Sequence, residues 1–140
     1  FIARRSVKGK EFNYPLGAEK PLYGLDVLAK YGKLSKPLYI TESMINCLSL
    51  WTHGFQAVAL NGTGSSEQIA MLKELPYRRL VLGLDGDNAG RKGTMRLYEA
   101  LKKFKLMTRL NLEDGVDIND ILMYNKDTFR ETIMKCEERF

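Results

Sequence analysis

"RLVLGLDGDNAG", residues 79–90, joins a strand-like apolar run to two acidic side chains. Residues 80–84 are almost wholly apolar, which is typical of a strand buried on both faces of a sheet. Asp85 and Asp87 follow this run, with only Gly86 between them. Because side chains two residues apart point to the same side of an extended segment, we expect both carboxylates to face one small volume.

Further apolar runs occur along the chain and alternate with helical patterns. Strands are predicted at residues 37–41, 56–60, 79–84 and 106–112. Helices are predicted at residues 42–54, 66–75, 88–104, 117–124 and 127–140, the first with Met44, Leu48 and Trp51 facing inward. This alternation predicts right-handed crossovers and a parallel sheet that is covered by helices on both faces.

The aspartate pair predicts a cation, because two carboxylates this close disfavour each other's ionisation. A hard divalent ion such as Mg²⁺ is suitable, since it binds few carboxylates and keeps waters that phosphate groups can displace. The residues after Asp87 open a helix, whose free amides add positive potential near the pair. The alternative is a plain surface turn, since Asp, Gly and Asn are also favoured in turns.

Glu42 follows the strand at residues 37–41 and stands at the start of the next helix. If that strand and the strand at 79–84 are neighbours, Glu42 and the two aspartates share one crevice beyond the carboxyl ends of the strands. Three convergent acids are typical of sites for phosphoryl or nucleotidyl transfer, in which metals activate the attacking oxygen and stabilise the leaving one. The alternative is a helix N-terminal acid that the helix dipole favours.

The composition is that of a globular domain, with 44% hydrophobic and 28% charged residues. No apolar run approaches the roughly 20 residues that span a bilayer, and no leader opens the chain, so we expect neither membrane association nor secretion. Cys47 and Cys136 fit buried thiols in a reducing compartment. The chain begins with Phe1, and we expect it to be a piece of a longer protein.

The net charge of +5 is unevenly distributed. Residues 1–36 hold eight basic and three acidic residues, whereas the rest of the chain is balanced. A local basic surface favours a polyanionic partner, although a solvated surface gives the same pattern. In this part we predict two short strands around a turn at residues 8–10, and a helix at residues 26–31. A polar segment at residues 32–37 separates this part from the rest of the chain.

The strand-end glutamate and the later aspartate pair resemble the TOPRIM domain. Four segments, "DGDNAGRKG", "LNGTGSS", "DGVDINDIL" and "KPLYGL", resemble its version in bacterial and phage DnaG-like primases. The resemblance covers nearly the whole chain and implies an α/β fold, with a TOPRIM-like (Rossmann-like), four-stranded, mainly parallel sheet flanked by helices and a small N-terminal β/α appendage. Residues 1–36 would then be the remnant of a basic N-terminal subdomain, and residues 37–140 the TOPRIM domain.

The resemblance also implies roles for individual acids. Glu42 would be a metal ligand or general base, and Asp85 and Asp87 would be catalytic metal ligands. Asp117 would be a further metal-binding acid, although it equally fits the N-cap of the helix that follows. The implied cofactor is Mg²⁺ or Mn²⁺.

The chain departs from the family pattern at three positions. Ser43 stands where primases usually have glycine, and Asn46 and Asn119 stand where acids are common. Asn46 lies one helical turn beyond Glu42 and would be a neutral ligand or hydrogen-bonding group. The site is therefore less acidic than the family pattern, and a second metal would bind it less strongly.

The same resemblance implies contacts with nucleotides or nucleic acid through Asn46 and through basic residues whose phosphate contacts are blind to base sequence. The basic residues are Lys20, Arg4, Arg5, Lys8, Lys10, Arg91 and Lys92. For Arg91 and Lys92 a solvated helix face is an equally good interpretation. The loop at residues 61–64 faces phosphate or is only a tight turn.

The activity implied is that of a DNA primase, a metal-dependent nucleotidyltransferase that synthesises RNA primers on single-stranded DNA during replication. Its partners would be the template, nucleoside triphosphates, the RNA primer and, through regions missing from this chain, a replicative helicase, in the cytoplasm of a bacterial or phage-infected cell. Two alternatives remain open: a TOPRIM nuclease or topoisomerase fragment, and a non-catalytic domain that binds DNA or docks in a replication complex.

Overall fold

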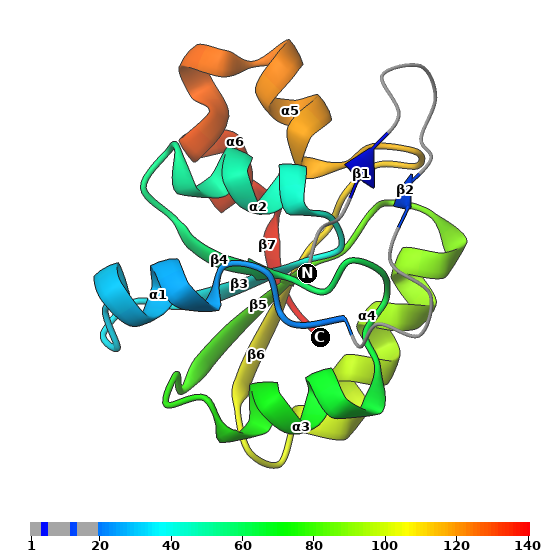
Figure 1. Ribbon diagram of the computed structural model, residues 1–140. Helices are drawn as coiled ribbons and strands as arrows, with labels where there is room; N and C mark the ends of the chain where they lie inside the picture. Colours follow the sequence, from blue (N-terminus) through cyan, green and yellow to red (C-terminus); the bar gives the residue numbers. More distant parts are fainter. Residues whose placement is uncertain (1–3, 6–11, 14–19) are drawn as a thin grey trace.

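The computed structural model describes residues 4–5, 12–13 and 20–140 of the 140-residue chain. Its centre is a five-stranded sheet with the order β4-β3-β5-β6-β7 (Figure 1). Four strands are parallel and the fifth is antiparallel to its neighbour. The parallel strands are β3 (Leu38–Thr41), β4 (Gln56–Ala59), β5 (Arg79–Gly83) and β6 (Leu106–Leu110), and the antiparallel one is β7 (Glu137–Arg139).

Helices cover both faces of this sheet, as the alternation of strands and helices predicted (Figure 1). Helices α3 (Ser66–Glu74) and α4 (Asn88–Leu101) pack on one face, and α2 (Met44–Trp51), α5 (Ile118–Tyr124) and α6 (Phe129–Cys136) on the other. Helix α1 (Leu25–Tyr31) packs beside β4, and a short 3₁₀ turn, Lys126–Thr128, precedes α6. Within the described part of the chain, no helix is long and apolar enough to cross a membrane.

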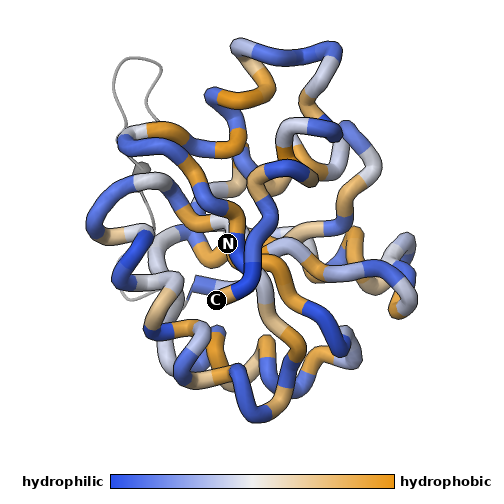
Figure 2. Tube along the Cα trace, turned by 180° about the vertical axis from the view of Figure 1, so that it is seen from behind, coloured by the Kyte–Doolittle hydropathy of each residue, from blue (hydrophilic) through white to orange (hydrophobic). Residues whose placement is uncertain are grey.

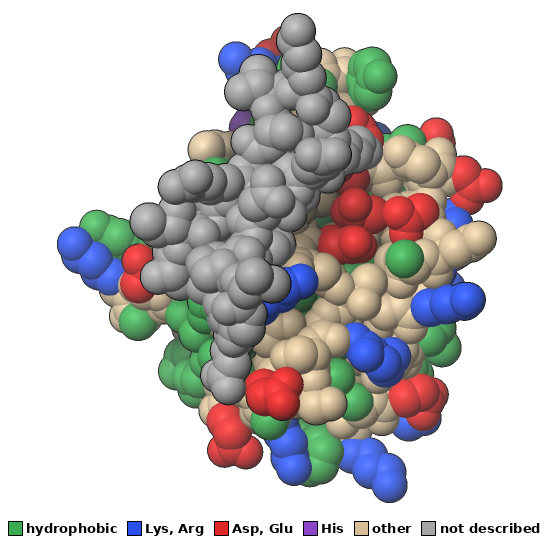
Figure 3. Space-filling view, turned by 45° about the vertical axis from the view of Figure 1, so that its right-hand side comes forward, with side chains coloured by type: hydrophobic (Ala, Val, Ile, Leu, Met, Phe, Trp, Pro, Cys, Tyr) green, Lys and Arg blue, Asp and Glu red, His purple; other side chains and the backbone are tan. Residues whose placement is uncertain are grey.

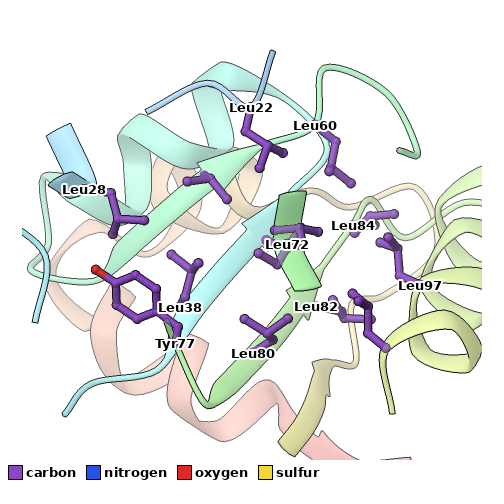
Figure 4. Close-up of a cluster of buried hydrophobic side chains, with 13 residues drawn as sticks. Leu22, Leu28, Leu38, Leu60, Leu72, Tyr77, Leu80, Leu82, Leu84 and Leu97 are labelled. Atoms are coloured by element: carbon purple, nitrogen blue, oxygen red, sulfur yellow. The ribbon is translucent and has the colours of Figure 1, made fainter. Parts of the chain in front are cut away.

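The core consists of two layers because successive strand residues point to opposite faces. Leu38 and Ile40 of β3 pack toward α3 and α4, in the cluster that Figure 4 shows. Tyr39, between them, packs toward α2 and α6 on the other face. In Figure 2 the hydrophobic residues accordingly run along the central strands. Burial on both faces explains why these strands read as continuous apolar runs.

The fifth strand was not predicted. The pattern at residues 127–140 indicated one closing helix, but α6 ends at Cys136 and residues 137–139 form β7. Polar contacts hold this strand to β6: Thr108 Oγ1 donates to Glu137 Oε1 at 2.7 Å, and Arg109 Nη2 lies 2.8 Å from Glu138 Oε1. A short charged edge strand lacks the apolar signal on which the four-stranded prediction rested, so that prediction was one strand short.

The inward face of α2 also differs from the prediction. Cys47 and Leu50 are buried, whereas Leu48, which was expected to face inward, is largely exposed. The buried stripe also contains polar residues, Asn46 and Ser49. A prediction from the spacing of hydrophobic residues does not detect buried polar residues. This explains why the predicted inward face of α2 was wrong.

The N-terminal part follows the prediction where it is described. The short strands β1 (Arg4–Arg5) and β2 (Phe12–Asn13) pair antiparallel, while the turn predicted at residues 8–10 lies outside the described residues. Leu28 of α1 packs in the same cluster as Leu38, and Tyr23 pairs with Ala59 at the edge of β4. The division into domains at residue 36 stays a prediction.

Helix α4 lies so close to the end of β5 that only glycine fits at its first turn. A Cβ at Gly90 would lie 2.0 Å from the backbone oxygen of Asp85. We therefore expect Gly90→Ala to lower the free energy of unfolding by about 1–3 kcal/mol, although alanine is the better helix former by about 1 kcal/mol. Urea denaturation measures this change.

Ala100→Ser is the matched control, since Ala100 is exposed on the same helix and the change is expected to stay within about 0.5 kcal/mol. A Gly90→Ala variant as stable as the control would show that α4 is not seated against β5 in this way.

Candidate active site

Glu42 and Asp85 meet at the carboxyl edge of the sheet. Strands β3 and β5 are neighbours, with Thr41 opposite Gly83, so the residues that follow them emerge side by side. The backbone N–H of Asp85 donates to Glu42 Oε2 at 3.3 Å. Figure 3 shows the acidic side chains gathered on this face of the molecule. The adjacency on which the predicted acidic crevice depends is therefore present.

Asp87 and Asp117 begin the two helices that point at this edge. Asp87 is the N-cap of α4 and accepts a hydrogen bond of 2.7 Å from the Gly90 N–H through Oδ1. Asp117 is the N-cap of α5 in a capping box with Asp120, with hydrogen bonds of 2.8 and 2.9 Å. The N-cap interpretation of Asp117 is confirmed, and its role as a metal ligand stays a prediction.

Gly86 lets the loop that carries Asp117 lie against the aspartate loop. The Gly86 N–H donates to the Val116 carbonyl at 3.0 Å, and the Gly115 N–H donates to the Gly86 carbonyl at 2.8 Å. A Cβ at Gly86 would lie 2.1 Å from the Glu113 carbonyl oxygen. Glycine is needed between the two aspartates because another backbone approaches, which the sequence could not show.

Asn46 joins three elements below the acidic edge. Its Nδ2 donates to Asp85 Oδ1 at 3.0 Å, and its Oδ1 accepts the backbone N–H of Asn119 at 3.0 Å. Asn119 in turn accepts from the Ser49 hydroxyl at 3.1 Å. Asn46 is 0% exposed, so in this conformation it orients Asp85 and does not face solvent. Its predicted contact with nucleotides stays a prediction.

The electrostatics of the edge favour binding of a positive charge. The pKa of Glu42 is raised above its ordinary value, mainly because burial removes water from the carboxylate and also because Asp87 and Asp117 repel its charge. The hydrogen bond from the Asp85 N–H partly offsets this rise. A cation at this position would relieve both the burial penalty and the repulsion.

The donors fit a hard divalent ion by their chemistry, because carboxylate oxygens are the ligands that Mg²⁺ prefers. Among the described residues, however, no group of three or more His, Cys, Asp and Glu side chains is arranged to hold a metal ion. Mg²⁺ is commonly bound through only one or two carboxylates, together with waters and substrate phosphates. Glu42 and Asp85 can supply these one or two carboxylates. Asp87 caps helix α4 through Oδ1, which leaves its Oδ2 to bind a ligand.

The predicted basic residues lie in different places. Lys20 lies beside the site and donates from Nζ to the Asn61 carbonyl oxygen at 3.2 Å. Arg91, in the first turn of α4, pairs with the exposed Asp114, and Lys92 is exposed on the same helix. For Arg4 and Arg5 only the backbone of β1 is described, and Lys8 and Lys10 lie outside the described residues.

Asn61 opens the loop at residues 61–64, and whether this loop faces phosphate stays a prediction. Asn61 follows Leu60 at the end of β4, has a positive φ of 53° and is 7% exposed. Its Oδ1 is buried and has no hydrogen-bond partner among the residues that the structure describes. The N–H of the next residue, Gly62, donates to the Glu42 carbonyl oxygen at 3.1 Å, which places the loop against the acidic edge. Such an orphaned acceptor is costly and often marks a functional site.

Replacing Asn46 tests the bridge between the three elements. Asn46→Leu removes both hydrogen bonds and leaves the partly buried Asp85 carboxylate and Asn119 N–H without this partner. We expect a loss of about 2–4 kcal/mol in the free energy of unfolding, measured by urea denaturation. Asn125→Leu, at an exposed position, is the control and should change stability by about 0.5 kcal/mol or less. Equal losses in the two variants would contradict the bridging role.

The raised pKa of Glu42 predicts a pH dependence of stability. An acid with a raised pKa binds its proton more tightly in the folded protein, so its ionisation costs stability. This cost is absent below the unfolded value of 4.5 and is fully present once the pH exceeds the folded pKa. Without divalent ions, Glu42→Gln should therefore be more stable than the unchanged protein at about pH 7, and the difference should vanish at about pH 4. Thermal melts in a chelating buffer measure it.

Glu99→Gln is the control for that series, because Glu99 is exposed and pairs with Lys102 on the surface of α4. A Glu42→Gln variant that is less stable than the unchanged protein at about pH 7 would contradict the electrostatic account of the edge.

Comparisons with known proteins agree with the fold described above. The DNA primase of Clostridium acetobutylicum is 27% identical over 115 residues, which are 80% of this chain and 19% of that protein. The primase of Aquifex aeolicus, in a structure of its zinc-binding and RNA polymerase domains, matches 96% of this chain and 36% of its own, with 22% identity and a TM-score of 0.74. A DNA primase domain from Pseudomonas aeruginosa matches 95% of this chain and 45% of its own, with 25% identity and a TM-score of 0.72.

The chain spans about a fifth of the length of the curated relatives it matches. The match to a protein family covers residues 39–122, which begin in β3 and end in α5 and so include the whole acidic edge. Because this match covers more than half of the chain, the chain belongs to the Toprim-like family.

Proposed function

We propose that this chain is the nucleotidyl-transfer domain of a DNA primase, which synthesises RNA primers on single-stranded DNA. The observation that carries the proposal is the meeting of Glu42 and Asp85 at the carboxyl edge, with Asp87 and the N-terminus of α4 beside them. The similarity to DNA primases over most of the chain supports it. The Toprim-like family membership is compatible with it.

In this proposal the carboxylates hold a divalent cation, and the chain's other groups bind the nucleotide. Glu42, Asp85 and Asp87 would be its ligands, with Asp117 as a further acid. Bound Mg²⁺ or Mn²⁺ would supply charge neutralisation at the triphosphate and activate the attacking hydroxyl. Asn46 keeps Asp85 oriented through its 3.0 Å hydrogen bond.

The reaction would be attack of a primer 3′-hydroxyl on the α-phosphate of a nucleoside triphosphate, with pyrophosphate leaving. Glu42, whose pKa is raised mainly by burial, would be the general base that takes up the hydroxyl proton. The amides at the start of α4 offer positive potential to the phosphates. Lys20, Arg91 and Lys92 would add phosphate contacts, which are sensitive to salt.

The proposal includes the partners and place expected for such an enzyme. These are the DNA template, nucleoside triphosphates and the RNA primer, with the basic N-terminal residues Arg4, Arg5, Lys8 and Lys10 on the nucleic acid. A replicative helicase would bind through other parts of the longer protein. The setting would be the cytoplasm of a bacterial or phage-infected cell.

One observation favours a second candidate, a non-catalytic domain that binds nucleic acid. Asn46 occupies a buried position between the acids, and within the described residues no closed set of three metal-binding side chains exists. A site weakened in this way would keep its affinity for phosphates and lose turnover. Binding of Mg²⁺ or Mn²⁺ by the protein, measured by calorimetry, separates this candidate from the first.

The test is Asp85→Asn in the full-length protein that contains this chain. The rate at which labelled ribonucleotides are incorporated on a single-stranded template with Mg²⁺ or Mn²⁺ should fall by about 100-fold or more. A loss of this size exceeds the usual effect of changing a residue that only supports a metal ligand. Glu99→Gln, an exposed carboxylate on α4, should leave the rate unchanged. Normal incorporation by Asp85→Asn would reject the assignment, and strand loss in place of primer synthesis would indicate a nuclease.

A further inference from the structure

A groove lies at the amino edge of the sheet, away from the acidic site. Two adjoining cavities of about 300 and 100 Å³ share Lys36, Gly54, Phe55 and Gln56 and so form one groove, here called the amino-edge groove. Pro37 precedes β3, Gln56 begins β4 and Arg79 begins β5, and all of them line it. Since Glu42 and Asp85 follow the opposite ends of these strands, the groove and the acidic site lie at opposite edges.

The floor of the groove is aromatic and its ends are apolar. Tyr39 and Phe55 pack edge to face at 5.0 Å and are almost fully buried. Tyr31 stands at one end and Met134 at the other, and these side chains are 62% and 60% exposed. Large apolar side chains this exposed around a cavity are typical of a surface that binds another molecule.

The walls of the groove carry positive charge that the described residues do not neutralise. The basic residues that line it are Lys33, Lys36, Arg79 and Arg130, against one acid, Glu137, which pairs with Arg79. In the described part of the chain, Lys33, Lys36 and Arg130 form no salt bridge. Arg130 lies over the Phe55 ring, 4.7 Å from its centroid, and donates to the His53 carbonyl oxygen.

We propose that the amino-edge groove docks an acidic segment of a partner protein. Carboxylates of that segment would pair with Lys33, Lys36 and Arg130, and one apolar side chain would lie over Phe55 between Tyr31 and Met134. The charge complementarity selects an acidic partner, and the apolar floor and ends select a peptide with an apolar anchor. The inference is independent of the proposed catalytic function, because the groove contains none of the residues assigned to that function.

A single-stranded nucleic acid fits the groove less well. Its bases need exposed aromatic faces on which to stack. Tyr39 and Phe55 are 3% and 9% exposed, and Arg130 covers one side of the Phe55 ring. Among the described aromatic residues that line the groove, Tyr31 is largely exposed and offers such a face, whereas Trp51 is only partly exposed.

The test uses a fluorescent peptide of Asp and Glu residues around a central Phe, added to the full-length protein that contains this chain and followed by fluorescence anisotropy. We expect binding that weakens about tenfold in Lys36→Glu and in Arg130→Glu, because the partner's carboxylates then meet a like charge. Met134→Ser should weaken it as well, through loss of the apolar contact. Lys103→Glu, which makes the same charge change at an exposed position outside the groove, should leave binding unchanged.

Several outcomes would overturn the proposal. The first is that the peptide does not bind, which is also the result if a segment of the longer protein already fills the groove. The second is that Lys103→Glu weakens peptide binding as much as the groove variants do, which would indicate unspecific charge attraction. Stronger competition by oligothymidylate than by the unlabelled peptide would assign the groove to nucleic acid. Lys36 is exposed, so its variant keeps the test valid if Arg130→Glu fails to fold. Primer synthesis should be unchanged in Lys36→Glu, which separates this test from that of the catalytic site.

Discussion

Four negative side chains are held near one another at one edge of the sheet, and hydrogen-bond donors of the chain itself make this possible. The Asp85 N–H binds Glu42, the Asn46 amide binds Asp85, the Gly90 N–H binds Asp87, and the Asp120 N–H binds Asp117. Each donor offsets part of the repulsion that like charges would otherwise produce. Three backbone N–H groups and one side-chain amide thus hold the four acidic side chains in place at this edge.

This requirement explains several residues around the edge. Three backbones have to approach one another so that their amides reach the carboxylates, and two glycines allow it. Gly86 admits the loop at residues 113–117, and Gly90 admits the start of α4. Asn46 completes the arrangement because a side-chain amide both donates and accepts, so that one residue fixes Asp85 and the start of α5 together.

Much of this architecture could be predicted from the sequence, because strong local patterns specify it. The apolar runs gave the four parallel strands, and the positions of Glu42 and Asp85 after two of them predicted their meeting. The resemblance to primases added the family, which the match at residues 39–122 confirmed. These patterns are local in the sequence. They predict the strands correctly because a parallel strand that is buried on both faces of a sheet is a nearly continuous apolar run.

What could not be predicted depends on distant or polar contacts. Asn46 contacts residues 39 and 73 positions away, and no spacing rule shows such pairs. Its burial also shifts the inward face of α2 away from Leu48. Strand β7 is charged and short, so its pairing with β6 is visible only once both segments are placed. The close approach at Gly86 likewise involves a backbone segment that is distant in the sequence.

The two margins of the five-stranded sheet have a consequence for assembly. Backbone groups on β4 pair with Tyr23 through hydrogen bonds of 2.9 and 3.0 Å, and β6 is bordered by a three-residue strand rich in charge. Open sheet margins are templates for cross-β aggregation, and short, charged or covered ones resist it. The margins of this sheet therefore disfavour the recruitment of neighbouring molecules by strand addition.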